Sequence, residues 1–171
     1  MRLPITLLLL VALIPVAQSA DNYRVGITAQ KKRLSVGEKK LEGHVQKVQE
    51  QWGYAVSVQN QSFKDVPDVR VDYIIFYRTE LPGRVENNTR DKRSTGSHTV
   101  GLLKNNVRET FETDPVNLQS AKLDVDYDWT SGAKTRAKDV LTGIKIRVKS
   151  GEAIIGEFAD PPALKASESW N

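Results

Sequence analysis

Apolar and polar residues alternate with a period of two along much of this 171-residue chain. Residues 54–59 follow this pattern, which predicts a half-buried strand. Residues 69–77 are apolar on both sides beyond Asp72, and such a run is typical of a central strand that is covered on both faces. We therefore expect Tyr73 and Ile75 to lie in the core.

Other segments carry the same pattern less completely. Residues 144–149 and 153–158 alternate on either side of Gly151, which predicts a β-hairpin with a tight turn. Only residues 37–51 have a helical spacing, and their glycines and valines disfavour a helix. Phe63 is expected to close one end of the core. Weaker strand patterns cover residues 22–28, 98–103, 107–113 and 125–130. Seven or eight short strands separated by turn signals indicate an all-β, antiparallel sandwich.

The first residues have the three-part plan of a secretory signal peptide. Arg2 precedes an uncharged, apolar run, and small residues follow it up to Ala20. The apolar run is shorter than the ~20 residues of a membrane-spanning helix, and no later stretch is long and apolar enough to span a bilayer. We expect residues 1–19 to be removed and residues 20–171 to form one secreted or periplasmic domain.

The composition excludes several kinds of chemistry. The chain has no cysteine and only two histidines, so disulfides, thiolate metal sites and a three-histidine zinc site are ruled out. Its 25 basic and 21 acidic residues give a formal net charge of +4, which is too mild to indicate nucleic acid as the partner of an exported protein. A short signal peptide without any disulfide favours a bacterial, extracytoplasmic protein.

One stretch carries a resemblance to known proteins. Residues 54–63, followed by residues 66–73, resemble the second and third strands of bacterial extracytoplasmic immunoglobulin-like modules of the fibronectin III and CARDB type. In these modules a strand ends at an asparagine, here Asn60, and the chain crosses over through a buried apolar residue. The sequence is also similar to uncharacterised secreted bacterial proteins with Thr-Ser-Gly-Ala-Lys, here 130–134, and Gly-Glu-Phe-Ala, here 156–159. The resemblance implies an immunoglobulin-like sandwich and no family chemistry.

Three aspartates suggest a metal site only at first sight. Asp124, Asp126 and Asp128 would project from one side of an extended segment, and calcium prefers such oxygen ligands. In a calcium loop that starts at Asp124, however, the sixth position is Trp129 instead of glycine and the twelfth is Thr135 instead of glutamate. We therefore expect a solvated acidic face, with no bound metal and no cofactor.

Residues 79–97 are mostly proline, glycine, asparagine and basic residues, with few apolar side chains. This composition predicts a long, mobile loop, which a protease should cleave first. The basic residues of this loop and two aromatic residues are the candidate partner contacts: Arg84, Arg90, Lys92, Arg93, Tyr127 and Trp129. The two aromatic residues are either core positions or a platform for a sugar ring. Further basic clusters lie at 31–33 and 134–138. If these clusters share one face, they could bind an acidic polymer, membrane headgroups or an acidic protein.

Two functions stay open. We expect a non-catalytic binding or structural module of the bacterial envelope, with a protein or a surface glycan as its partner. The alternative is a hydrolase of surface polysaccharide that uses two carboxylates about 5 to 10 Å apart. The sequence contains no Gly-x-Ser-x-Gly nucleophile motif, and its two histidines, His44 and His98, are expected to be polar strand residues.

Overall fold

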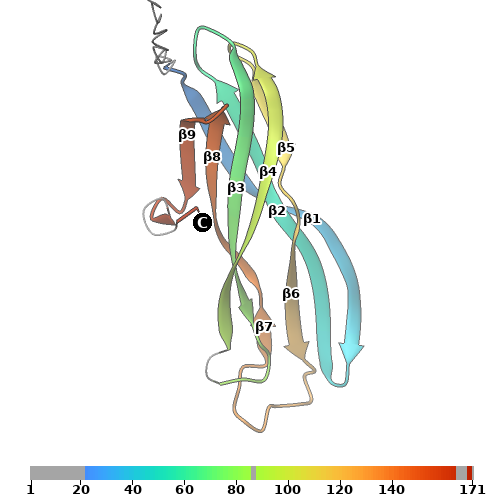
Figure 1. Ribbon diagram of the computed structural model, residues 1–171. Coiled ribbons are helices and arrows are strands. Elements are labelled where there is room, and N and C mark those ends of the chain that lie inside the picture. Colours follow the sequence, from blue (N-terminus) through green and yellow to red (C-terminus); the bar gives the residue numbers. More distant parts are fainter. Residues whose placement is uncertain (1–21, 86–87, 165–168, 171) are drawn as a thin grey trace, which may run out of the picture.

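The computed structural model describes residues 22–85, 88–164 and 169–170, so the expected signal peptide at 1–19 lies outside the described residues. The described residues form an all-β sandwich of nine strands (Figure 1). The strands are β1 (Val25–Glu42), β2 (Val45–Asn60), β3 (Val66–Glu80), β4 (Thr89–Leu103), β5 (Arg108–Glu112), β6 (Val116–Leu123), β7 (Arg136–Lys138), β8 (Val140–Ser150) and β9 (Ala153–Asp160). No helix among them is long and apolar enough to cross a membrane.

The strands form two antiparallel sheets. Sheet A has the order β1-β2-β6-β7, and β5 pairs with β2 beyond the end of β6. Sheet B has the order β4-β3-β8-β9. The chain therefore changes sheet three times before β9: between β2 and β3, between β4 and β5, and between β7 and β8. The expected hairpin of β8 and β9 is confirmed, with Gly151 at a φ of 56° in its turn.

The core lies between the upper halves of the two sheets. On β2 the predicted inward residues are all fully buried. On β3, Tyr73 and Ile75 belong to the same hydrophobic cluster, as expected. Apolar residues on β8 complete this cluster. They point inward because they alternate with the charged residues Lys145, Arg147 and Lys149. The inward residues of β2 and β8 are Tyr54, Val56, Val58, Ile144, Ile146 and Val148.

The outer face of β3 is also covered, as its apolar pattern predicts. Ile74 is 2% and Phe76 9% exposed, although both point away from the sandwich core. The segment after β9 lies over this face: a Cβ at Gly143, which is paired with Phe76, would come within 2.4 Å of Leu164 Cδ1. Because Gly143 has no side chain, the segment after β9 has room to pack here.

The prediction of a long, mobile loop at 79–97 is wrong. β3 runs to Glu80 and β4 begins at Thr89, so the connection spans only residues 81–88. β4 pairs with β3 along almost its whole length, and Arg78 forms an ion pair with Asp91 across the two strands. The polar composition reflects an exposed edge strand, whose backbone hydrogen bonds stabilise it without apolar burial.

The expected position of Phe63 is also wrong, because its side chain is wholly exposed. The buried Asn60 explains this turn: its side-chain amide donates to the carbonyls of Lys64 at 2.9 Å and Leu103 at 3.0 Å. Its carbonyl oxygen accepts from the backbone N–H of Ser62 at 2.8 Å. These bonds fix a tight turn with Phe63 outside, and Tyr23 packs against this part of the core instead.

Candidate functional site

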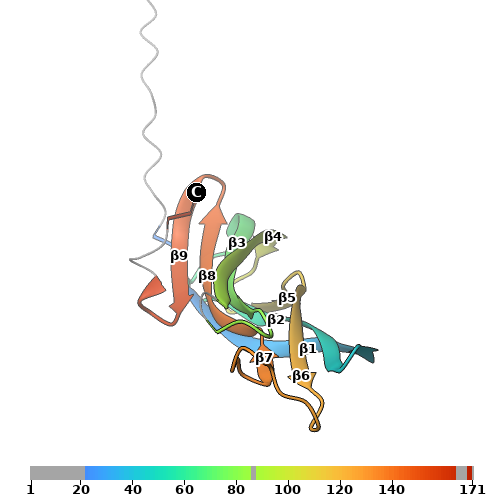
Figure 2. The ribbon, with the colours of Figure 1, turned by 90° about the horizontal axis from the view of Figure 1, so that it is seen from below.

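At the end where β1 and β2 turn at Gly43, sheet A bends away to one side of sheet B (Figure 1). Seen from below, the far ends of β1 and β2 lie to one side of sheet B (Figure 2). In this half of β2, the inward positions Gln46, Val48, Glu50 and Trp52 are exposed or half-buried, whereas those beyond Trp52 are fully buried. One half of the inner face of sheet A is therefore open.

Two hollows follow one another on this open face. One, of about 190 Å³, is lined by Lys31, Glu50, Trp52, Leu118, Lys138, Asp139, Val140 and Leu141. The other, of about 290 Å³, is lined by Gln46, Val48, Ser120, Ala121, Lys122, Arg136, Ala137 and Lys138. Because Lys138 lines both hollows, we describe them together as the basic groove.

The floor of the basic groove contains the apolar side chains of Val48, Trp52 and Leu118. Strand pairing places Glu50 opposite Leu118 and Val48 opposite Ser120, so these side chains share the inner face. The indole of Trp52 lies beside them and donates a hydrogen bond from Nε1 to Glu50 Oε2 at 2.8 Å. This bond fixes the ring plane at the boundary between the open face and the closed core.

Four basic residues surround this floor: Lys31, Lys122, Arg136 and Lys138. Lys31 Nζ donates to the carbonyl of Leu141 at 3.0 Å. Lys122, Arg136 and Lys138 are exposed and form no ion pair within the described part of the chain. These charges are free to attract an anion.

Two of the predicted basic clusters thus meet on one face. The cluster at 31–33 contributes Lys31, and the cluster at 134–138 contributes Arg136 and Lys138. Sequence reasoning missed Lys122, because the strand that carries it was not predicted. Its burial pattern explains the omission: Val116 and Leu118 are two residues apart, but the next buried position is Ala121, so the period of two breaks inside β6.

The groove also contains two carboxylates, and both accept hydrogen bonds from the protein. Glu50 accepts from the Trp52 indole and from Arg33 Nη1, the latter at 3.3 Å. Asp139 accepts from the backbone N–H groups of Glu80 and Gln119, each at 2.8 Å. Asp139 therefore ties the end of β3 to β6 and holds one wall of the groove.

The candidate partner contacts from the sequence are dispersed. Arg84 lies in the connection 81–88, where the neighbouring Gly83 packs against the indole of Trp129. Tyr127 stacks on His44 with ring centroids 3.6 Å apart. On β4, Arg90 and Lys92 are paired with Thr79 and Tyr77 on one face, and Arg93 is paired with Phe76 on the other. None of the six lines the basic groove.

The expected strand at 125–130 is wrong. The backbone turns here, with a hydrogen bond from the N–H of Tyr127 to the carbonyl of Asp124 at 3.1 Å. Asp124 Oδ1 also accepts from the N–H of Val125, so the three aspartates do not line one side of a strand. Within the described residues, no three His, Cys, Asp or Glu side chains are grouped to hold a metal ion.

Comparison with known proteins adds little to this geometry. No family model matches the sequence, and no curated protein matches it. A crystal structure of a Bordetella pertussis protein assigned as ApaA is 11% identical and has a TM-score of 0.36, with 80% of this chain and 92% of that chain covered. The structural genomics target SoR45 is 12% identical with a TM-score of 0.34, covering 86% and 95% of the two chains. Likenesses this weak carry no argument about the function of this chain.

Proposed function

We propose that this chain is an extracytoplasmic, non-catalytic binding module that holds an acidic polymer, such as an acidic surface polysaccharide, in the basic groove. The observation that supports this best is the meeting of Lys31 with Arg136 and Lys138 above the Trp52 and Leu118 floor. Charges attract the anionic groups of such a polymer, while the apolar floor offers contact to the faces of its sugar rings.

The open shape of the groove favours a polymer over a small molecule. The two hollows succeed one another along β2, β6 and β7, and residues of sheet B line only one of them, through Val140 and Leu141 of β8. A linear ligand can contact all four basic residues in turn, whereas a small ligand would reach only part of them.

Binding is favoured over hydrolysis because both carboxylates of the groove have a structural role in holding parts of the protein together. Glu50 is engaged by the Trp52 indole and Arg33, and Asp139 is engaged by two backbone N–H groups. A carboxylate that acts as a general acid or nucleophile must instead face the scissile bond.

The immunoglobulin-like architecture is also part of this proposal. Strands β1, β2, β5, β6 and β7 share one sheet, which faces a sheet ordered β4-β3-β8-β9. This arrangement supports the proposal, because in immunoglobulin-like sandwiches the first, second and fifth strands share one sheet and the third, sixth and seventh share the other. Secretion is supported by the leader-like sequence at 1–19.

The test is binding of polygalacturonate, with neutral dextran for comparison, measured by isothermal titration calorimetry. A variant with Lys122→Gln, Arg136→Gln and Lys138→Gln should weaken polygalacturonate binding at least about tenfold, since hydrogen bonds to charged groups contribute ~1.5–3 kcal/mol each. The affinity of the unmodified chain should also fall as salt rises from roughly 50 to 200 mM, because salt screens charge.

The matched control carries Arg24→Gln, Lys40→Gln and Lys104→Gln, which remove the same charge outside the groove. Equal loss in both variants would mean that net charge alone attracts the polymer, and the groove would then be discarded. Release of new reducing ends from polygalacturonate would instead support the hydrolase.

A further inference from the structure

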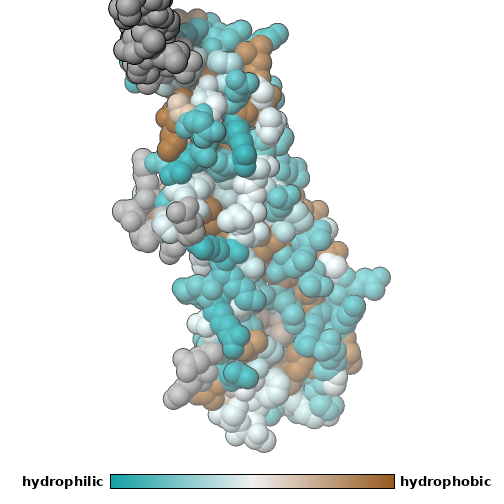
Figure 3. All heavy atoms as spheres, viewed as in Figure 1, coloured by the Kyte–Doolittle hydropathy of each residue, from teal (hydrophilic) through white to brown (hydrophobic). Residues whose placement is uncertain are grey.

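Another hollow lies on the outer face of sheet B, apart from the basic groove on sheet A. The face of the molecule in Figure 3 is mainly hydrophilic. The hollow has a volume of about 430 Å³ and is lined by Arg70, Asp72, Tyr73, Ile74, Thr95, Gly96, Ser97, Arg147, Lys149 and Trp170. Strand pairing brings these together, because Asp72 lies between Ser97 of β4 and Arg147 of β8.

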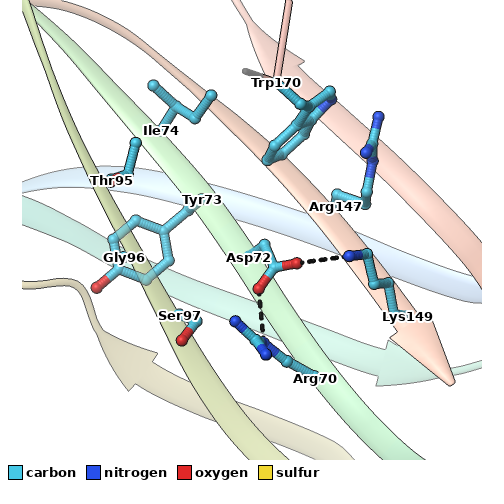
Figure 4. A pocket seen from close by; sticks show the side chains of 10 residues that line it. All are labelled: Arg70, Asp72, Tyr73, Ile74, Thr95, Gly96, Ser97, Arg147, Lys149 and Trp170. Atoms are coloured by element: carbon cyan, nitrogen blue, oxygen red, sulfur yellow. Dashed lines mark hydrogen bonds and ion pairs between the residues drawn. The ribbon is translucent and has the colours of Figure 1, made fainter. Parts of the chain in front are cut away.

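Asp72 is the centre of this outer hollow (Figure 4). Its two carboxylate oxygens accept from Arg70 Nε at 2.8 Å and from Lys149 Nζ at 3.1 Å. Each donor keeps further N–H groups, since a guanidinium has five and an ammonium three. The cations therefore retain donors for a ligand while Asp72 holds them in place.

Trp170 forms one wall. Its ring lies over the guanidinium of Arg147, with Cζ 4.2 Å from the ring centroid, and Arg147 is itself bonded to Glu157 at 3.0 Å. The buried Ile74 lies on the same side of the sheet as this indole. The C-terminal segment thus supplies an aromatic surface directly beside three cations.

We infer that the outer hollow binds an acidic saccharide, a sugar ring carrying a carboxylate, between Trp170 and the Arg70, Asp72 and Lys149 cluster. This site goes beyond the proposed function, because it shares no residue with the basic groove.

The mixture of groups selects this ligand class. Arg70 and Lys149 donate to a carboxylate, which a guanidinium can bind with two parallel bonds. Asp72, Thr95 and Ser97 offer acceptors for sugar hydroxyl groups, while the carboxylate of Asp72 disfavours a compact anion such as sulfate, which has no hydroxyl to donate. The indole face that Arg147 does not cover provides contact area for the apolar side of the ring. The volume of the hollow lies in the range of small-ligand sites.

The experiment is an NMR titration of the ¹⁵N-labelled chain with methyl glucuronide, methyl glucoside and sulfate. Methyl glucuronide should shift the Trp170 indole and the amides of Thr95 and Ser97 saturably. Arg70→Gln and Trp170→Ala should each weaken its binding about tenfold, the loss expected for one charged hydrogen bond or one aromatic contact at the upper end of its range. Neutral methyl glucoside should bind at least about tenfold more weakly, because it lacks the carboxylate.

Arg78→Gln is the matched control, since Arg78 lies on the same strand and face as Arg70 and is likewise paired with an aspartate, but lies outside the hollow. It should leave binding unchanged. No saturable shift by glucuronide, or equal shifts by sulfate, would overturn the proposal. The basic groove variant with three Gln substitutions should keep glucuronide binding at Trp170. Loss of that binding would assign the sugar to the groove and also overturn this site.

Discussion

The two halves of β2 lie on one continuous strand with one alternation, yet they end in opposite environments. Beyond Trp52 the inward residues Tyr54, Val56 and Val58 are fully buried against sheet B. Before Trp52 the inward residues Val48 and Glu50 are only half-buried. The alternation is the same in both halves, but the lower half pairs with β6 and with a bulged part of β1, and its Val48 lies outside the core cluster between the sheets.

This comparison separates stability from recognition. Apolar surface in the upper half is removed from water and stabilises the fold at roughly 25 cal/mol per Å². Apolar surface in the lower half stays accessible and is bordered by free cations at Lys122 and Arg136. The half of sheet A that diverges from sheet B is the surface that we propose for binding.

The largest expected effect on stability comes from removing a core side chain in the closed half. Ile75→Ala removes a fully buried side chain and should lower the free energy of unfolding by roughly 2–5 kcal/mol. Val48→Ala, on the open half, should lower it by about 1 kcal/mol or less. Urea denaturation of the two variants measures both values. Similar losses would mean that the lower half is packed as tightly as the core.

A smaller loss is expected at the turn that closes the upper half. Asn60→Ala leaves the carbonyls of Lys64 and Leu103 and the N–H of Ser62 without their side-chain partner, which should cost about 1–3 kcal/mol. Asn117→Ala, on the exposed side of β6, should change little. If both changes prove equally harmless by thermal denaturation, the Asn60 network does not hold the turn.

Removing the hydroxyl group from each of two buried tyrosines in the closed half should have opposite effects on stability. The Tyr54 hydroxyl is buried without a hydrogen-bond partner in the described residues, so Tyr54→Phe should be neutral or stabilise by about 1 kcal/mol. The Tyr73 hydroxyl donates to Asp114 Oδ2 and accepts from the Asp114 N–H, each at 3.0 Å. Tyr73→Phe should therefore cost about 0.5–1.5 kcal/mol for each bond lost. Equal destabilisation in urea would contradict the assignment.

The same tyrosines should make the protein less stable at alkaline pH. Burial raises the pKa of both Tyr54 and Tyr73 above the ordinary value. Below about pH 10 both the folded and unfolded phenols are neutral. As pH rises above that value, only the unfolded chain loses these protons, so stability should fall. Denaturation curves from about pH 8 to 11 measure this fall, and it should be smaller in Tyr54→Phe.

The smallest effect concerns local opening without a change in overall stability. Arg84 lies in the connection 81–88, whereas Arg90, Lys92 and Arg93 are held in β4 by pairing with β3. Brief trypsin digestion should therefore cut after Arg84 before it cuts within β4, because cleavage requires local unfolding of a strand. First cleavage after Lys92 or Arg93, read by mass spectrometry, would show that the lower end of β4 frays.

Alternation was sufficient to predict the core strands of this protein. The period of two in residues 54–59 and 144–158 predicted two inward faces that the core uses, and the double-sided apolar run around Ile75 predicted a strand covered on both faces. These features depend on neighbouring residues, which a sequence displays directly. The polar segment 89–97 was misread because edge pairing can hold a strand that lacks an apolar face. The strand β6 was missed because its period of two is interrupted.

The tertiary structure alone decided how the pieces combine. Lys31 and Lys138 are far apart in the chain, and only the order β1-β2-β6-β7 brings them to one groove. Likewise, only the return of the C-terminal segment over Gly143 places Trp170 beside Arg147. The reason is that alternation fixes which side of its own strand a residue occupies, whereas strand order and the length of the opposing sheet arise from pairing between distant segments.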